Sequence, residues 1–216
     1  MTDRLEKIYA KIPSCEVFAD IGCDHGYMAK AMIDGGKCKK VIISDVSENC
    51  LKKAQFLLKD YLLNGVAESV VSDGFDRVGH CDCALIAGMG GEEICSIIEK
   101  AKNADNLPEN LVLQPMKNCE KVRVCALANG YAFFNDFVFK SAGKFYNLMV
   151  LKKGEDTLSD DEILFGRDNV KNPSADFKQM IEINYTKLCS LLKKGDISES
   201  VRTQILEKMD KLKKYV

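Results

Sequence analysis

The fold of this chain is decided by nine residues, Ala19-Asp20-Ile21-Gly22-Cys23-Asp24-His25-Gly26-Tyr27. They close a short apolar run that we expect to be a strand over 16–20, and they open an expected helix over 26–35. A sharp turn at the carboxyl end of the first strand is where open α/β sheets bind nucleotide-like ligands. Gly22 lets the backbone approach a ligand without a Cβ in the way, and we expect Gly26 to ease packing of the helix on the sheet.

The acidic character of this turn limits the ligand that it can hold. The dinucleotide fingerprint G-x-G-x-x-G fails here, because Asp24 stands where its second glycine belongs. A carboxylate at that position would repel a pyrophosphate, whereas Asp20 at the strand end suits a cationic ligand with an amino group. A turn that holds no ligand is the alternative that the residues leave open.

Working outward, short β-rich runs alternate with helical stretches as far as residue 151. The expected strands are 16–20, 40–44, 68–71, 82–87, 110–114, 131–139 and 144–151, and the expected helices are 26–35, 48–63, 91–103 and 118–129. Such alternation predicts a parallel sheet with right-handed crossovers. Only four residues separate the last two strands, so these should form an antiparallel hairpin. We therefore expect an α/β fold with a Rossmann-like, seven-stranded core.

The remaining residues predict a second, helical unit, with the domain boundary between 1–152 and 153–216. Ser159 and Glu162 have the spacing of a capping box just before an apolar run. Two helices with apolar stripes should follow, joined by a turn at 193–196, and pack as an antiparallel, coiled-coil-like hairpin. The stripes are Phe177, Ile181, Tyr185, Leu188 and Leu192, and Val201, Ile205, Met209, Leu212 and Val216.

Acidic residues also follow the second and third strands. Asp45 closes the second strand, where a carboxylate can accept hydrogen bonds from both hydroxyls of a ribose, with Val46 beside the sugar. Asp73 and Gly74 follow the third strand, where an acid can accept from an adenine amine. A helix cap for Asp45 and a plain turn for Asp73 are the alternatives.

The fourth strand ends in Ala87-Gly88-Met89-Gly90-Gly91. Three glycines in five residues at a strand-to-helix junction imply a close backbone approach to something flat or bulky. We assign Ala87, Gly88 and Met89 to the nucleoside ligand, and Gly90 and Gly91 to a second substrate.

The fifth strand ends in Gln114 and Pro115, on the same sheet edge. The Gln114 amide can read the edge of a base, although a solvated loop residue is an equally good explanation. Taken together, an acid or a glycine-rich element follows each of the first four strands and an amide follows the fifth, which places every candidate at the functional edge of such folds.

These motifs resemble the bacterial tRNA (adenine-22-N1)-methyltransferase family. The matching blocks are ADIGCDHGY at 19–27, SDGF at 72–75, IAGMGGEEI at 86–94, LVLQP at 111–115 and GKFYNLMV at 143–150. The resemblance covers nearly the whole chain and departs from the family at Met116, where members often have Asn. It implies a class I methyltransferase that uses S-adenosylmethionine, releases S-adenosylhomocysteine and methylates N1 of an adenine in tRNA.

The resemblance also implies residue roles. Asp24 and Tyr27 fall on the acid and the aromatic residue implicated around the target base, and are the expected catalytic residues. His25 is better explained as a helix-start residue than as a catalytic one. The expected cofactor-binding residues are Asp20, Gly22, Asp45, Val46, Asp73, Gly74, Ala87, Gly88 and Met89. The expected substrate-binding residues are Gly90, Gly91, Gln114 and Pro115.

Composition limits how RNA can be bound. The chain has 31 Lys and Arg against 32 Asp and Glu, a net charge of −1, so RNA must be held by a local patch. The candidate phosphate contacts are Lys117, Lys121 and Arg123, with Lys193, Lys194, Lys208, Lys211, Lys213 and Lys214 in the tail.

The ten cysteines do not form a recognisable metal motif. Cys81-x-Cys83 is too tight for the usual zinc pair, so we expect reduced cysteines and no structural metal. No apolar run approaches the roughly 20 residues that span a bilayer, and 1–6 has no apolar signal segment. We expect a cytoplasmic, monomeric protein without a membrane partner.

Two other function classes remain open on the sequence. A nicotinamide-dependent oxidoreductase would share the fold, but the missing middle glycine counts against it. A non-catalytic protein that binds S-adenosylmethionine or RNA would keep the same motifs.

Overall fold

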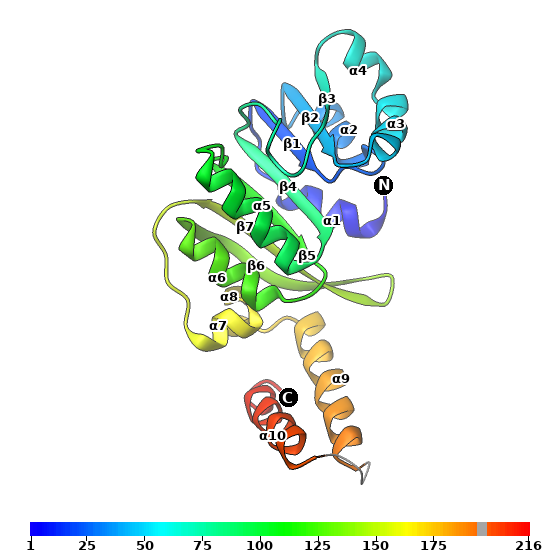
Figure 1. Ribbon diagram of the computed structural model, residues 1–216. Coiled ribbons are helices and arrows are strands. Elements are labelled where there is room, and N and C mark those ends of the chain that lie inside the picture. The colour runs from blue at the N-terminus through cyan, green and yellow to red at the C-terminus, as the bar shows by residue number, and fades with distance from the viewer. Residues whose placement is uncertain (194–197) are drawn as a thin grey trace.

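The computed structural model describes residues 1–193 and 198–216, which form a twisted seven-stranded sheet flanked by helices (Figure 1). The strand order is β3-β2-β1-β4-β5-β7-β6. The strands are β1 (Val17–Ile21), β2 (Lys40–Asp45), β3 (Ala67–Val71), β4 (Cys83–Met89), β5 (Asn110–Pro115), β6 (Tyr131–Ser141) and β7 (Lys144–Lys153). The expected fold, five parallel strands completed by an antiparallel hairpin, is confirmed.

The helices of the sheet region match the sequence prediction with two differences. They are α1 (Asp3–Lys11), α2 (Tyr27–Asp34), α3 (Glu48–Leu57), α4 (Lys59–Leu63), α5 (Gly91–Asn103) and α6 (Cys119–Ala128). The predicted helix 48–63 is divided at Leu58, whose backbone leaves the helical region. Helix α1 was not predicted; Thr2 caps it, and Ile8 is its one buried residue.

The order of the strands reverses next to β1, which pairs in parallel with β2 on one side and with β4 on the other. In this register Ile21 lies opposite both Ser44 and Ile86, so these three strands end together at one edge of the sheet. Ligands of open α/β sheets bind in the crevice outside the strand ends at such a switch point.

Alternating residues of the strands pack into two cores, one on each face of the sheet. Ala19 and Ile21 join the core with Ile98 of α5, whereas Phe18 joins the core with Met32 of α2. Because successive side chains of a strand point to opposite faces, both faces of β1 are buried. The strand is therefore fixed on both sides, which gives the turn after it a defined position.

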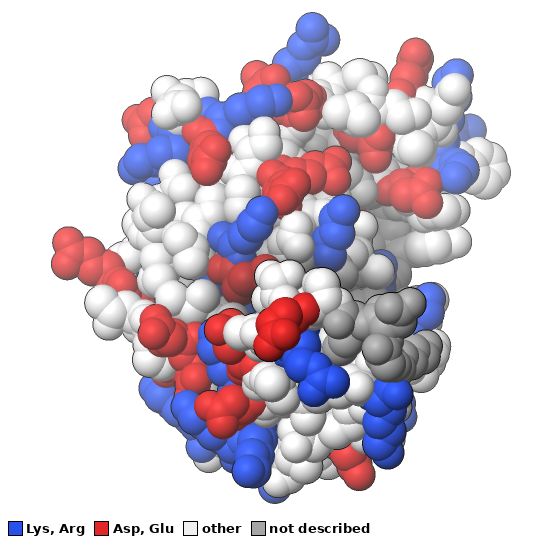
Figure 2. All heavy atoms as spheres, turned by 60° about the horizontal axis from the view of Figure 1, so that its bottom comes forward, with Lys and Arg blue, Asp and Glu red and all other residues white. Residues whose placement is uncertain are grey.

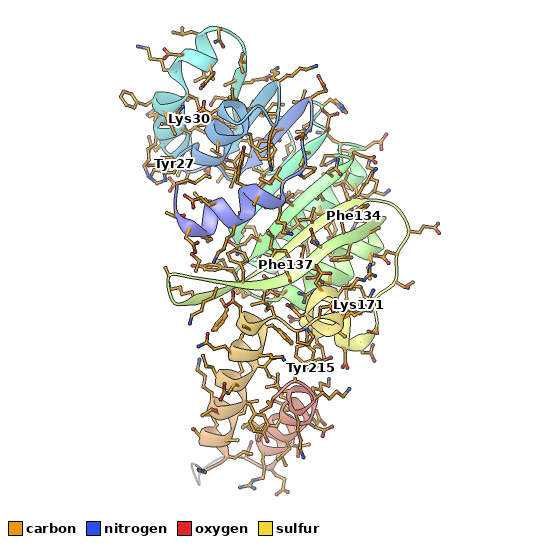
Figure 3. All side chains as sticks on the ribbon, turned by 180° about the vertical axis from the view of Figure 1, so that it is seen from behind. Tyr27, Lys30, Phe134, Phe137, Lys171 and Tyr215 are labelled. Atoms are coloured by element: carbon orange, nitrogen blue, oxygen red, sulfur yellow. The ribbon has the colours of Figure 1, made fainter. Side chains whose placement is uncertain are left out.

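The chain after β7 forms α7 (Asp160–Phe165), α8 (Arg167–Lys171), α9 (Ala175–Leu192) and α10 (Glu199–Lys213). The predicted capping box of Ser159 and Glu162 is confirmed. Helices α9 and α10 lie side by side beyond the β6–β7 hairpin (Figure 1). Tyr215 packs edge-on against Phe165 and Phe177, which fixes the end of the chain to α7 and α9 (Figure 3). Of the predicted turn at 193–196, residues 194–196 lie outside the described residues.

A buried ion pair attaches these helices to the sheet. Arg123 of α6 and Asp136 of β6 have fully buried side chains and are joined by two hydrogen bonds, Nε to Oδ2 at 2.7 Å and Nη2 to Oδ1 at 2.9 Å. Arg123 Nη1 also donates to the carbonyl oxygen of Ile163 in α7 at 3.0 Å. A Cβ on Gly166 would lie only 2.8 Å from Asp136 Oδ1, so the turn between α7 and α8 requires glycine there.

This pair corrects one prediction. Arg123 was expected to contact phosphate, but its guanidinium is buried and committed to a carboxylate and to backbone carbonyls. The prediction is wrong because a lone basic residue on a helix does not reveal which side of that helix is covered.

We expect Asp136→Asn to lower the free energy of unfolding by about 3–5 kcal/mol, because it leaves the buried Arg123 charge without a counter-ion. Urea unfolding followed by circular dichroism measures the change. Glu16→Gln, which breaks the solvent-exposed pair of Glu16 with Lys39, is the matched control and should have a much smaller effect. Equal effects of the two substitutions would contradict the importance of the buried pair.

Candidate functional site

A cavity of about 190 Å³ opens at the carboxyl ends of β1 and β4. Of the predicted site residues, it brings together Asp20, Gly22, Asp24, Tyr27 and Ala87. The other lining residues are Arg4, Leu5, Cys23, His25, Gly26, Met28 and Leu85. The acidic turn and the end of the fourth strand thus converge, as their positions in a parallel sheet predict.

The turn after β1 is held against β2 by its backbone. The amide groups of Gly22 and Cys23 both donate to the carbonyl oxygen of Ser44, at 2.8 and 2.9 Å. Gly22 has a φ of 76°, and a Cβ on it would lie 2.0 Å from the Met89 side chain. The positive φ is what favours glycine here, because the Met89 atom concerned is the end of a flexible side chain that could move aside.

Gly26 is also needed for a close approach, but with a different partner from the one predicted. Its φ is 74°, and a Cβ would lie 3.1 Å from the Cβ of Ala54 in α3. The glycine therefore lets the start of α2 pack against a neighbouring helix, and the expectation that it eases packing on the sheet is wrong. The sequence contains no signal for the contact between 26 and 54.

Asp20 is the buried acid of the cavity, with 8% of its surface exposed. Burial raises the pKa of its carboxyl from 3.8 to about 6, and the Cys23 thiol and the Ala29 amide lower it by less. A buried carboxylate is costly unless a cation or hydrogen-bond donors compensate for its lost hydration. This environment suits a ligand that brings a positive charge.

Asp24 and Tyr27 are linked through His25 at the rim of the cavity. Asp24 Oδ2 lies 2.6 Å from His25 Nδ1, and its Oδ1 accepts from Lys53 of α3 at 3.0 Å. The rings of His25 and Tyr27 stack nearly parallel, with centroids 5.5 Å apart. Tyr27 is half exposed and lies beside the N-terminal end of α1 (Figure 3). An acid and an accessible aromatic face are thus presented together.

At the ends of β2 and β3 the predicted residues have local partners. Asp45 Oδ1 accepts from the Ser47 amide at 2.8 Å, and Val46 is exposed at the same edge. Asp73 forms an ion pair with Lys100 of α5. A Cβ on Gly74 would lie 2.9 Å from Ile97, so the third turn packs closely on α5. The cofactor roles of these four residues stay predictions.

The glycines after β4 have different surroundings. Gly88 is exposed with a φ of 83°, and Gly90 lies beside the Lys117 side chain. A Cβ on Gly91 would lie 2.6 Å from the carbonyl oxygens of Lys117 and Asn118. The close approach predicted for a ligand is therefore made, at Gly91, by the protein's own backbone.

Gln114 is completely buried beside Pro115. Its Oε1 accepts from Arg4 Nη1 at 2.9 Å, and its Nε2 donates to the Pro115 carbonyl at 3.1 Å. Because the amide is engaged within the protein, contact with a base edge stays a prediction. Sequence reasoning missed Arg4, which lies before the first strand and 110 residues away from its partner.

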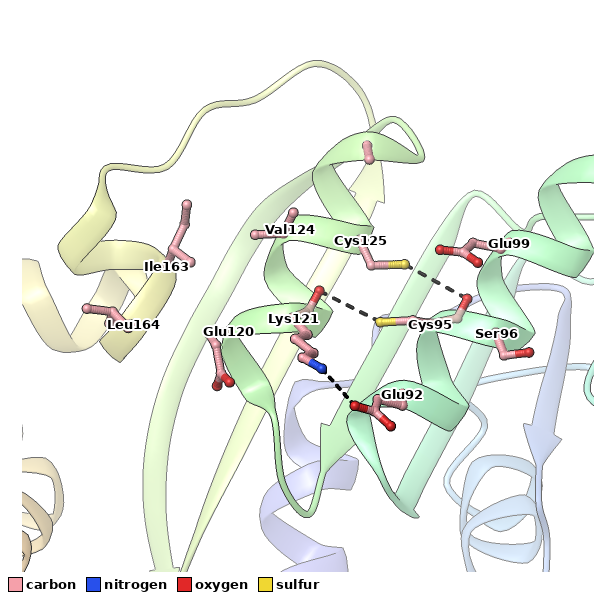
Figure 4. Close-up of a pocket in the computed structure, with 11 residues that line it drawn as sticks. Glu92, Cys95, Ser96, Glu99, Glu120, Lys121, Val124, Cys125, Ile163 and Leu164 are labelled. Carbon is pink, nitrogen blue, oxygen red and sulfur yellow. Dashed lines mark hydrogen bonds and ion pairs between the residues drawn. The ribbon is translucent and has the colours of Figure 1, made fainter. Parts of the chain in front are cut away.

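A larger hollow of about 570 Å³ lies between α5, α6 and α7 (Figure 4). Its lining includes Cys95, Val124 and Leu164, with Lys121 paired to Glu92 across the rim at 2.7 Å. It contains none of the predicted catalytic, cofactor-binding or substrate-binding residues, and among the candidate phosphate contacts only Lys121 lines it. Helix faces form it rather than strand ends. We therefore place the functional site at the smaller cavity, where the strand ends converge.

Among the described residues, neither a metal-binding cluster nor a membrane-spanning helix accompanies this site. No group of three or more His, Cys, Asp or Glu side chains in that part of the chain is arranged to hold a metal ion. No helix within it is both long enough and apolar enough to cross a membrane.

Residues 1–149 match the sequence family described as a methyltransferase domain. The chain belongs to this methyltransferase family. The matched region includes the cavity and all strand ends described above, so the family assignment and the site geometry concern the same part of the molecule.

Individual relatives of this methyltransferase chain are named as tRNA methyltransferases. The tRNA (adenine(22)-N(1))-methyltransferase of Bacillus subtilis is 28% identical over 157 residues, which cover 72% of this chain and 66% of the relative. The match therefore spans just under two thirds of that curated relative. The crystal structure of the B. subtilis m1A22 tRNA methyltransferase TrmK has a TM-score of 0.87 and 25% identity, over 100% of this chain and 98% of that one.

A Streptococcus pneumoniae protein crystallised with S-adenosyl-L-methionine has a TM-score of 0.89 and 25% identity. This likeness covers 100% of this methyltransferase chain and 99% of the other. The matches confirm the family resemblance that the sequence motifs indicated.

We expect Asp20→Asn to stabilise the protein at pH 8, by about 1–3 kcal/mol, and to have little effect at pH 4. The folded-state pKa of about 6 lies above the ordinary 3.8, so the folded state keeps a proton that the unfolded state loses between these values. Wild-type stability should therefore fall as pH rises from about 4 to 6, whereas the variant lacks this loss. Urea unfolding at several pH values measures it, and parallel curves for the two proteins would contradict the buried charge.

Proposed function

We propose that this chain transfers a methyl group from S-adenosylmethionine to N1 of an adenine in tRNA, corresponding to position 22, and releases S-adenosylhomocysteine. The observation that carries the proposal is the cavity after β1 and β4, where Asp20, Asp24 and Tyr27 meet in a chain of the methyltransferase family. The names of the relatives support the substrate and the position of the base.

The residues present fit this cofactor. The cavity of about 190 Å³ is smaller than the roughly 300–1,000 Å³ of a typical ligand pocket. It suits the amino-acid part of S-adenosylmethionine, with the buried Asp20 facing a positive charge. We assign the ribose to Asp45 and Val46 at the end of β2, and the adenine to Asp73 and Gly74 after β3. Gly22, Ala87, Gly88 and Met89 would border the cofactor.

The chemistry of methyl transfer to adenine N1 requires few polar residues from the protein. When bound, S-adenosylmethionine supplies an electrophilic methyl group on a sulfonium. Adenine N1 carries an in-plane lone pair, so no base has to deprotonate it first, and the protein mainly has to align the reactants. The product ring is cationic, and the Asp24 carboxylate would stabilise that charge. The exposed face of Tyr27 would stack on the base, beside Gly90, Gly91 and the Gln114–Pro115 strand end.

Binding of tRNA would rely on local basic groups, because the charges are mixed over the face drawn in Figure 2. Lys117 lies beside Gly90, and Lys187, Lys208 and Lys211 line a hollow of about 420 Å³ between α7, α9 and α10. We assign cofactor binding to 1–152 and tRNA contacts partly to the helical residues 153–216. We infer a cytoplasmic location from the proposed tRNA substrate.

We expect Asp24→Ala and Tyr27→Ala each to lower the rate of methyl transfer about 100-fold or more, while S-adenosylmethionine still binds. Tyr27→Phe separates stacking by the ring from hydrogen bonding by the hydroxyl, since it keeps the ring and removes the hydroxyl. Single-turnover transfer to tRNA and calorimetry measure the two effects. Asp60→Ala on the surface of α4 is the control, and unchanged transfer in the Asp24 variant would refute the role of its carboxylate.

Mass spectrometry of nucleosides from tRNA incubated with the protein and S-adenosylmethionine tests the activity itself. We expect 1-methyladenosine to appear, and to depend on an adenine at position 22. If the cofactor binds and bulk tRNA gains no 1-methyladenosine, the proposed acceptor is wrong. Calorimetry with NAD distinguishes the oxidoreductase alternative, which predicts binding of the dinucleotide in place of S-adenosylmethionine.

A further inference from the structure

Helix α1 places the guanidinium of Arg4 at the cavity. No sequence motif indicated this residue. Arg4 lines the same cavity as Asp20 and Ala87. It is held from two sides, because Nη1 donates to Gln114 Oε1 at 2.9 Å and the guanidinium lies 5.5 Å from the centre of the Tyr146 ring. The position is therefore defined before any ligand binds.

Arg4 differs from the arginines that maintain the fold. Arg123 and Arg167 are each paired with a carboxylate, Asp136 and Asp156. No carboxylate among residues 1–193 and 198–216 forms such a pair with Arg4. A guanidinium has five N–H donors in a planar fork that matches a carboxylate. Most of these donors remain available beside the cavity.

The cavity thus contains groups of both signs within one small volume. Asp20 is buried and favours a cation, and Arg4 offers a fork for an anion. An α-amino acid group carries an ammonium and a carboxylate on the same carbon, and a cavity of about 190 Å³ accommodates such a group. A ligand with only a positive charge would leave Arg4 without a counter-ion.

We propose that Arg4 binds the α-carboxylate of the amino-acid part of the cofactor, while Asp20 faces its α-ammonium. This inference rests on the proposed function and adds α1 to the cofactor site. It also gives Gln114 a role, since its buried amide orients the guanidinium and makes it a positioning residue. Binding then requires α1 to be docked on the sheet, with Thr2 capping its first turn.

The test compares two ligands that differ only in the carboxylate. S-adenosylhomocysteine has it, and its decarboxylated analogue, S-adenosyl-3-thiopropylamine, does not. Calorimetry with the full chain gives both dissociation constants. We expect the wild type to prefer S-adenosylhomocysteine by about 10- to 100-fold, the range for a charge-assisted, bidentate contact.

Arg4→Gln should lose most of this preference by weakening S-adenosylhomocysteine alone, and Arg4→Lys should retain part of it, because a lysine keeps the charge without the fork. Lys7→Gln is the matched control, since Lys7 is one turn along α1 and lies over the Phe139 ring. It should keep the wild-type ratio. Thermal unfolding without ligand verifies that each variant is folded.

The outcomes separate this inference from the proposed function. If Arg4→Gln and Arg4→Lys weaken both ligands equally, Arg4 has only a structural role and the inference is overturned. An unchanged ratio in both variants overturns it as well. If the wild type binds neither ligand, the proposed use of S-adenosylmethionine fails and the inference fails with it.

Discussion

The parallel pairing of β1 with both β2 and β4 is the constraint on which the site depends. The two registers bring the ends of three strands together at one edge, and burial on both faces fixes β1 in place. Reversal of strand order beside β1 opens the crevice that receives ligands in this class of sheet. The Gly22 turn then closes the strand without side-chain bulk, so acids on neighbouring residues border the same cavity.

The charged groups of the site differ in how well their charges are compensated. A buried carboxylate, Asp20, loses hydration and has its pKa raised to about 6. Asp24, at the rim, has cationic and hydrogen-bonding neighbours in Lys53 and His25. Arg4 is the opposite case, a cation held by neutral groups. The buried charge of Asp20 is costly in the free protein, and a ligand with a complementary charge would recover that cost on binding.

The helical end of the chain is connected to the sheet by polar and apolar contacts. The buried pair of Arg123 and Asp136 ties α6, β6 and the turn after α7 together, and the aromatic cluster around Tyr215 returns the end of the chain to the same region. These contacts give α9 and α10 a defined position relative to the sheet. The proposed tRNA substrate is large enough to contact both parts at once.

The sequence by itself determined the strands to within two residues at each end, the antiparallel hairpin, the capping box and the convergence of Asp20, Gly22, Asp24, Tyr27 and Ala87. These features depend on periodicity and on contacts between near neighbours, which leave a local pattern. Only the tertiary structure decided the burial of Gln114 and Arg123, the backbone partner of Gly91, the packing of Gly26 on α3 and the place of Arg4. Each of these is set by a contact between distant segments, and the identity of the partner is not encoded in the residues on either side.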